Sequence, residues 1–175
     1  LRIETVKPNR LKIELDFGGS RLQAQPGGFA PALTASWLHG APAGNLKAVI
    51  EGELQPGRSD FDGFNGFAFE DPARKVSSAP ATLFEGQLDG NGKATPRLQL
   101  NSNQALPGRL QAVFKTRVFE NGGGFSSDNF SIPYDPFPAY AGVRIPHNDA
   151  GGPQVEVGAA APLTFAGVSA QGQPL

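Results

Sequence analysis

The stretch SWLHGAPAGNLKAVIEG, residues 36–52, decides the fold class of this chain. Its centre, GAPAGN at 40–45, breaks regular structure, and apolar side chains alternate with polar ones on both sides of it, over residues 33–39 and 46–54. Alternation with a period of two is typical of a β-strand that buries one face. Two such strands joined by a connection rich in glycine and proline predict consecutive strands of an antiparallel sheet or of a sandwich.

Trp37 is the only tryptophan of the chain, and it falls on the apolar side of the first of these strands. We expect its ring to pack in the core, because aromatic side chains contribute much of a core's stabilisation when they are buried. The alternative interpretation is an exposed platform on which a ligand stacks.

Strand signals recur along the whole chain and predict an all-β fold. The 23 glycines and 16 prolines leave little room for long helices, and no window shows helical periodicity. We therefore predict an antiparallel β-sandwich, immunoglobulin-like in class, with about seven strands over residues 1–145. Five further segments are expected to be strands, at residues 11–17, 83–88, 93–100, 110–119 and 126–134.

The segment DGNG, residues 89–92, predicts a tight turn because glycine and asparagine accept positive φ. It separates two of the predicted strands and therefore predicts a β-hairpin, with Gly90 or Gly92 at the positive φ. Prolines at the end of the last predicted strand and beyond it are expected to prevent regular ladder pairing, since proline has no N–H to donate. These prolines are Pro133, Pro136 and Pro138.

The segment HNDAGGP, residues 147–153, has the composition of a joint between domains. Short strands are expected at 154–157 and 163–168, and this tail is too short to close a core of its own. We therefore predict a sandwich domain at 1–145, followed at 146–175 by a linker and the partial start of the next β-domain. The chain begins without methionine and without the apolar segment of a signal peptide, and we expect it to be a piece of a longer polypeptide.

The composition excludes several classes of function. The chain has 15 basic and 16 acidic residues, a net charge of -1 and no basic stripe, so we expect no nucleic-acid partner. Cysteine is absent, which excludes disulfides, thiolate metal sites and cysteine nucleophiles within this chain. No run of about 18 apolar residues occurs, so we expect no direct membrane insertion by this segment.

A calcium site is one interpretation of the segment that contains Asp60, Asp62 and Asn65, because calcium prefers clustered oxygen ligands. The spacing of these residues does not fit an EF-hand loop, and the sequence favours an aspartate-rich turn. Two aromatic residues of the same segment, Phe61 and Phe64, are expected to clamp the loop onto the body of the domain.

The remaining candidates for metal-binding, phosphate-binding or catalytic residues are better explained as turn and surface residues. His39 and His147 lie in different breaker segments without further zinc ligands nearby, and the glycines at 122–124 lack the lysine and the helix of a phosphate loop. No G-x-S-x-G sequence occurs. We therefore predict no enzyme activity and no catalytic, cofactor-binding or metal-binding residues. Two carboxylate pairs are assigned to solvated strand faces, Glu14 with Asp16 and Glu51 with Glu53.

The order and spacing of several stretches resemble the macroglobulin-like β-sandwich repeats of bacterial alpha-2-macroglobulin-like proteins. The resemblance covers most of residues 6–145, and the tail from about residue 146 resembles the first strands of the next repeat. The matching stretches are VKPNRLKIELDFG at 6–18, WLHGAPAGNLKA at 37–48, FAFEDP at 67–72, LDGNGKA at 88–94, RVFENGGGFS at 117–126 and YDPFPAYAGV at 134–143.

The resemblance implies that this macroglobulin-like sandwich belongs to a large periplasmic protein, often a lipoprotein anchored in the inner membrane, that traps proteases. In many members a bait segment is cleaved, the molecule rearranges, and a Cys-Glu-Gln thioester captures the protease. A chain without cysteine has no thioester, so the resemblance implies a scaffold repeat of a broad-spectrum protease inhibitor. Its partners would be neighbouring domains of the parent chain and, for the full-length protein, target proteases.

An alternative function remains open at this point. The same sandwich could be a protein- or carbohydrate-binding module of an exported bacterial assembly, with the aromatic segment 61–69 as its contact surface. The sequence that flanks the chain would discriminate the two hypotheses. Further repeats and a Cys-Glu-Gln motif downstream would favour the inhibitor, and a neighbouring catalytic domain would favour the binding module.

Overall fold

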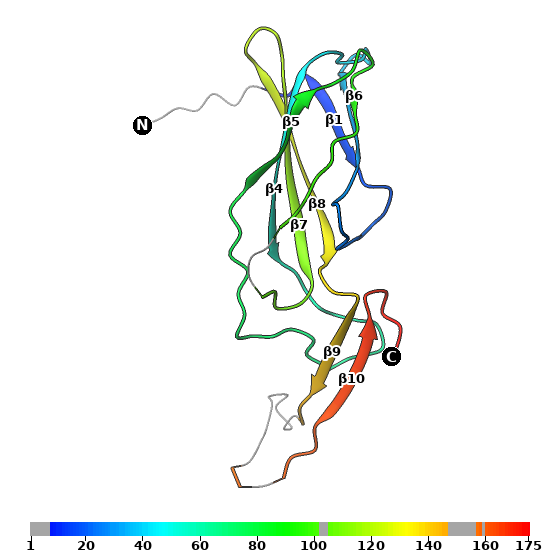
Figure 1. Cartoon of the computed structure of the whole chain (residues 1–175), viewed down its shortest axis with the longest axis vertical. Coiled ribbons are helices and arrows are strands. Elements are labelled where there is room, and N and C mark those ends of the chain that lie inside the picture. The colour runs from blue at the N-terminus through cyan, green and yellow to red at the C-terminus, as the bar shows by residue number, and fades with distance from the viewer. Residues whose placement is uncertain (1–7, 102–104, 147–156, 159) are drawn as a thin grey trace, which may run out of the picture.

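The structure, a computed structural model, describes residues 8–101, 105–146, 157–158 and 160–175. These residues form strands, turns and bends, and no helix occurs among them. Two sheets pack face to face as a sandwich, and a β-hairpin continues from one end of it (Figure 1). The predicted all-β sandwich is confirmed.

The larger sheet has five strands in the order β2-β8-β7-β4-β5, and the smaller has three in the order β1-β3-β6. Strands pair antiparallel throughout except for the short parallel pair of β2 with β8. The larger sheet comprises β2 (Leu22–Gln23), β4 (Lys47–Pro56), β5 (Ala81–Gln87), β7 (Leu110–Phe119) and β8 (Phe125–Asp135). The smaller sheet comprises β1 (Leu11–Asp16), β3 (Ala32–Trp37) and β6 (Lys93–Ala94). The hairpin consists of β9 (Ala139–Arg144) and β10 (Thr164–Ser169).

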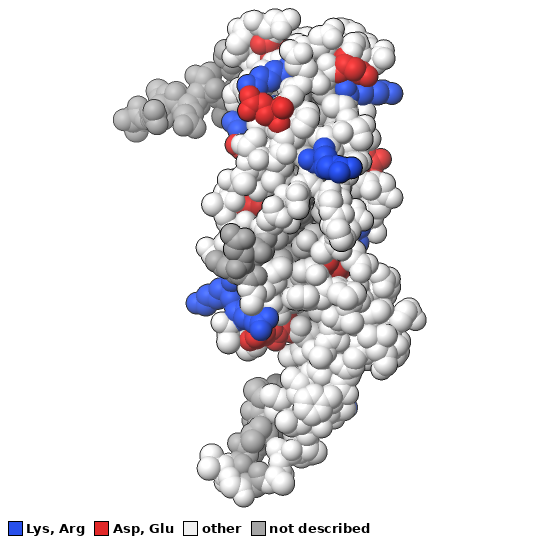
Figure 2. Space-filling view, in the orientation of Figure 1, with Lys and Arg blue, Asp and Glu red and all other residues white. Residues whose placement is uncertain are grey.

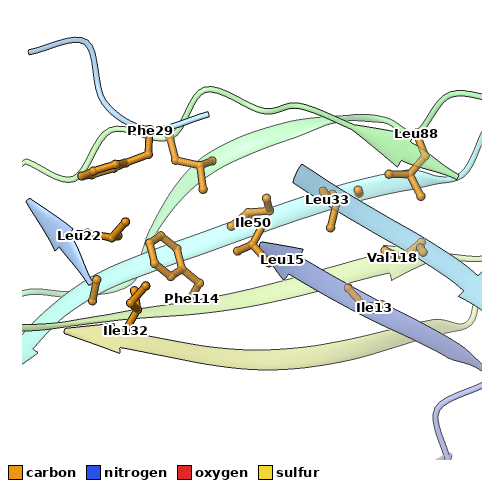
Figure 3. Packing of buried hydrophobic residues seen from close by; sticks show 14 of the residues in the cluster. Ile13, Leu15, Leu22, Phe29, Leu33, Ile50, Leu88, Phe114, Val118 and Ile132 are labelled. Carbon is orange, nitrogen blue, oxygen red and sulfur yellow. The ribbon is translucent and has the colours of Figure 1, made fainter. Parts of the chain in front are cut away.

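The core fills the space between the two sheets (Figure 3). Leu33 of β3, Ile50 of β4 and Phe114 of β7 are fully buried there. Phe17, which follows β1, reaches across the sandwich and places its ring 4.9 Å from that of Phe114 and 5.8 Å from that of Phe130. Burying one such side chain contributes about 2–3 kcal/mol, so the alternating apolar residues of both sheets hold the sandwich together.

The breaker at 40–45 carries the chain from one sheet to the other, because β3 belongs to the smaller sheet and β4 to the larger. Of the two arrangements that this stretch alone predicts, a sheet or a sandwich, the structure has the sandwich. Trp37, the last residue of β3, is half-buried and packs against the edge of the core. Its ring stacks with that of His39, with centroids 6.3 Å apart, and the Arg10 guanidinium lies 5.4 Å from its centroid. His39 and Arg10 therefore contact the Trp37 ring on which a ligand would have to stack.

The hairpin predicted around residues 89–92 is wrong, although its turn is present. The Gly92 N–H donates to the Asp89 carbonyl over 3.0 Å, and Gly92 has a φ of 73°. The flanking strands do not pair with each other, because β5 pairs with β4 and β6 pairs with β3. The turn therefore connects the two sheets of the sandwich. Turn chemistry predicts the local conformation of four residues, but it does not determine which neighbour each flanking strand finds.

The expectation for Pro133 is also wrong. β8 continues through it to Asp135, and Pro133 lies opposite Gln111 in the ladder with β7. β2 begins to pair with β8 only at Tyr134, so β8 is an edge strand at Pro133. An edge position tolerates a residue that has no N–H to donate.

The two glycines of the turn provide a matched pair for a stability test. A Cβ on Gly92 would lie 2.3 Å from the Ala35 carbonyl oxygen, whereas a Cβ on Gly90 would meet nothing within 4 Å. Gly92→Ala should lower the free energy of unfolding by about 1–3 kcal/mol, because it combines this clash with a positive φ. Gly90→Ala should change it by less than about 0.5 kcal/mol. Urea denaturation followed by Trp37 fluorescence measures both, and equal midpoints would contradict the assignment.

Candidate functional site

The hairpin joins the sandwich through a second, smaller hydrophobic core. β9 and β10 pair in register from Thr164 opposite Arg144 to Ser169 opposite Ala139. The loop between β4 and β5 runs down to the hairpin (Figure 1) and packs on one of its faces. The buried members of this second core are Phe61, Phe69, Tyr140, Val168 and Ala170.

Aromatic rings from the loop provide most of this contact. The Phe61 centroid lies 4.8 Å from that of Phe69 and 5.4 Å from that of Tyr140. The loop also pairs with the edge of β9, since Ala68 and Val143 exchange two main-chain hydrogen bonds of 2.8 and 3.0 Å. Phe61 and Phe64 both belong to this core, so the predicted aromatic clamp is present, but it holds the loop on the hairpin and not on the sandwich.

Gly142 of β9 permits this close packing. A Cβ there would lie 2.4 Å from the nearest atom of the Phe69 ring. The absence of a side chain lets the ring lie directly against the strand, a common reason for glycine within a strand.

Arg109, which directly precedes β7, lies at the centre of the contact between sandwich and hairpin. Its Nε donates to Asp135 Oδ1 over 2.8 Å, and its Nη1 donates to the Asp60 carbonyl over 2.8 Å. Its Nη2 donates to the Ala170 carbonyl in the turn after β10. The guanidinium also lies over the Phe61 ring, 3.8 Å from the centroid, where a cation–π attraction stabilises it. One buried side chain thus connects β7, the end of β8, the loop and the tail.

Asp135, the last residue of β8, is the counterion and is fully buried. Besides Arg109 it accepts a hydrogen bond of 3.0 Å from the Tyr140 hydroxyl and one of 3.2 Å from Arg21 Nη1. Burial, followed by the neighbouring Asp135 carboxylate, raises the pKa of Tyr140 well above its usual range. Tyr140 therefore stays neutral and donates a hydrogen bond to the Asp135 carboxylate. We call Arg109, Asp135 and Tyr140, together with Phe61, the joint.

A buried serine fixes the loop beside the joint. Ser59 Oγ accepts a hydrogen bond of 2.8 Å from the Arg109 main-chain N–H. The Ser59 N–H donates in turn to Glu70 Oε1 over 2.9 Å. The two ends of the aromatic segment are thereby held together, and the Phe61 ring is placed under the guanidinium.

An open cleft of about 660 Å³ lies beside the joint. Polar and charged residues line most of it, among them Arg21, Asp60, Asp62 and Gln173. Within the described ranges no group of three or more acidic or histidine side chains could hold a metal ion. The Asp60 carboxylate pairs with Arg58 Nε at 2.9 Å, and its carbonyl binds Arg109. These contacts assign Asp60 to the structure of the loop.

The other candidates from the sequence are spread over the molecule. His39 stacks on Trp37, and His147 lies outside the described residues. Residues 122–124 form a turn closed by a 2.8 Å hydrogen bond from the Glu120 N–H to the Gly124 carbonyl. The carboxylate pairs are not dyads, since each has a member bound elsewhere. Glu14 contacts Lys12 at 2.7 Å, and Glu51 contacts Arg117 at 2.5 Å.

The sequence did not point to Arg109 or Asp135. They lie 26 positions apart, and neither belongs to a motif. The one available signal was the position of Asp135 in YDPFPAYAGV, a stretch that carries the family resemblance and also contains Tyr140.

Comparison with known proteins identifies the class of the sandwich. Residues 9–135 match the family described as the bacterial alpha-2-macroglobulin MG5 domain. The match ends at Asp135 of the joint. Because it covers well over half of the chain, the chain belongs to this family, and the predicted resemblance is confirmed. A comparison with curated protein sequences gives no match.

Solved structures of bacterial alpha-2-macroglobulins have the same fold. The Escherichia coli protein activated by porcine elastase is 25% identical with a TM-score of 0.60, over 95% of this chain and 14% of that one. The native conformation of the Escherichia coli protein is 24% identical with a TM-score of 0.59, over 98% and 11%. The Salmonella protein reacted with methylamine is 20% identical with a TM-score of 0.60, over 98% and 12%. The chain thus spans a small part of the length of these proteins.

Removing the arginine of the joint should destabilise the protein strongly. Arg109→Met leaves the Asp135 carboxylate buried without its main counterion, which should lower the free energy of unfolding by about 3 kcal/mol. Arg21→Met is the matched control, because Arg21 faces the same carboxylate but its side chain is 40% exposed. It should cost less than about 1 kcal/mol. Chemical denaturation measures both, and similar costs would show that the buried pair is not the principal contact.

The joint should also weaken at high pH. Tyr140 has a folded-state pKa above its unfolded value of about 10, so its contribution is complete below pH 10 and is lost as pH rises through the folded pKa. While only the unfolded chain has lost this proton, the free energy of unfolding should fall by about 1.4 kcal/mol per pH unit. Tyr140→Phe should remove this part of the slope. An unchanged pH dependence in Tyr140→Phe would place the titration elsewhere.

Proposed function

We propose that this chain is a structural scaffold domain of a bacterial alpha-2-macroglobulin that acts as a broad-spectrum protease-trapping inhibitor. The observation that carries the proposal is the family match over residues 9–135, which ends where the sandwich meets the joint. Two of the similar structures are alpha-2-macroglobulins activated by elastase or by trypsin, so these relatives respond to proteases. The function is a property of the full-length protein, in which this domain is one of many.

The domain would act as a rigid element that keeps its neighbours in place and passes a displacement from one to the other. Close-packed cores deform little under load, so a displacement of the hairpin passes to the sandwich. The joint also fixes the orientation of the hairpin, because the Arg109 guanidinium must keep its hydrogen bonds to three different segments at once. We propose a domain boundary in this region, with the hairpin as the start of the next repeat. The boundary predicted near residue 145 stays a prediction; it would separate β9 from β10, and the pairing of these two strands supports a boundary before β9.

Catalysis and covalent capture are not proposed for this chain. It has no cysteine for a thioester. The binding-module alternative is less favoured because the aromatic segment 61–69, its proposed contact surface, packs on the hairpin. Charges of both signs are interspersed on the face seen in Figure 2, which offers no basic stripe to nucleic acid. No helix in the described part of the chain is long and apolar enough to cross a membrane.

We also propose that the full-length protein is periplasmic and anchored to the inner membrane as a lipoprotein. The support for this location is the family match, together with the location that the resemblance implies for members of this family. Fractionation of cells that express the full-length protein tests the proposal, and recovery in the cytosol would contradict it.

The role of scaffold makes a negative prediction for the isolated chain. Incubated with several unrelated endoproteases, it should neither inhibit them stoichiometrically nor give a product of higher mass that survives denaturing electrophoresis. The full-length protein should trap the same proteases. Covalent capture or stoichiometric inhibition by the isolated chain would overturn the proposal.

The joint can be tested in the full-length protein with the same pair of variants. Arg109→Met should lower the number of protease molecules trapped per inhibitor, while Arg21→Met should leave it near the unmodified value. Equal trapping by the two variants would show that the joint does not take part in the movement.

A further inference from the structure

The hairpin has a second apolar face, opposite the one that the aromatic loop covers. Side chains alternate between the two faces of a sheet, so Tyr140 and Val168 face the loop while Phe165 faces away. Phe165 is 74% exposed and pairs across the hairpin with Val143. The next pair on the same face is Gly167 with Ala141. A sheet that is apolar on both faces is typical of an inner layer covered on both sides.

The end of the described chain already lies on the free edge of β10. After Ser169 the chain turns, and Pro174 bridges antiparallel to Val168. The Leu175 N–H donates to the Gly167 carbonyl over 3.0 Å. Leu175 is 78% exposed, and its Cβ lies 3.4 Å from the position of a Cβ on Gly167, on the uncovered face. The chain therefore runs back along β10 in the register of a third strand.

The contact with Leu175 leaves further main-chain groups on this edge of β10 available for pairing. Alternate residues of a strand present their N–H and C=O groups to the same edge, so Phe165 offers its main-chain groups next to those of Gly167. The opposite edge of the hairpin is occupied, because Ala68 bonds to Val143 there. Figure 2 shows no charged side chains on the viewed face of the end that holds β9 and β10.

We propose that the uncovered face and the free edge of β10 are the docking surface for the remainder of the repeat that the hairpin begins. The chain continues antiparallel along β10 as the next strand of that repeat, and the second residue after Leu175 lies opposite Phe165 on the uncovered face and is apolar. The proposal rests on the proposed function in one respect, that this domain is part of a longer chain. The length of the similar structures and the direction of the chain at Leu175 support this occupant over a second copy of the chain.

The absence of cysteine allows a direct test by thiol labelling. Phe165→Cys is made in the present chain and in a chain extended C-terminally through the remainder of the repeat that the hairpin begins. Leu38→Cys is the matched control, because Leu38 is 70% exposed and lies just beyond β3, at the sandwich. In the present chain both cysteines should react at similar rates. In the extended chain the cysteine at 165 should react at least about tenfold more slowly, and the one at 38 should keep its rate.

Amide exchange provides a readout without substitutions. The Phe165 N–H should exchange quickly in the present chain and slowly in the extended one, because a third strand would accept its hydrogen bond.

Two results would overturn the proposal. One is unchanged labelling and exchange at residue 165 in the extended chain. The other is protection at residue 165 that already appears in the present chain and grows with its concentration, which would assign the surface to a second copy. Neither measurement involves a protease, so the docking surface can be established even if the trapping function is refuted.

Discussion

The arrangement of the two parts of this protein depends on one buried ion pair, between Arg109 and Asp135. Taking both charges out of water is costly, and the cost is offset only when the remaining donors and acceptors are satisfied. Here carbonyls of the loop and the tail accept from the guanidinium, and Tyr140 and Arg21 donate to the carboxylate. The pair therefore stabilises only the arrangement in which sandwich, loop and hairpin are all in place.

The sandwich is stabilised in a different way, by apolar alternation. β4 and β7 pair over ten residues each, and their inward side chains meet those of the smaller sheet. The outer edge strand β5 is protected from pairing with other chains by a register shift at Ile50 and Glu51 and by Pro80 just before it. Bulges and prolines are common protections of such edges. Within the described residues β10 pairs with β9 without a register shift, and its other edge is bridged only near its end, by Pro174 at Val168.

The sequence predicted features that depend on neighbouring residues and missed those that depend on distant ones. Alternation over residues 11–17, 46–54 and 110–119 reports burial directly, and these segments became β1, β4 and β7. The turn at Gly92 was predicted because φ is a local property. The pairing of its flanking strands was missed because the choice of partner is decided by the packing of two sheets.

The joint could not be predicted for the same reason, because its residues are distant from one another in the sequence. Arg109 next to a predicted strand looks like an ordinary polar residue at the end of a strand, and Asp135 looks like the start of a turn before Pro136. Their proximity arises only when β7 and β8 pair and the aromatic loop returns to the hairpin. The aromatic spacing of 61–69 did predict a clamp, because clustered phenylalanines must be buried somewhere. It could not show that the clamp holds the hairpin.

The combination of an aromatic core and a buried ion pair makes the connection between the two parts resistant to sliding. Hydrophobic contact alone is non-directional, so the rings of Phe61, Phe69 and Tyr140 would tolerate a small rotation of the hairpin. The hydrogen bonds of Arg109 would not, because a rotation large enough to lengthen one of them also displaces the Asp60 and Ala170 carbonyls from the same fork. The guanidinium would then be buried without its acceptors, a state that costs several kcal/mol. The hairpin is therefore expected either to move with the sandwich as one body or to separate from it completely, with no stable intermediate position.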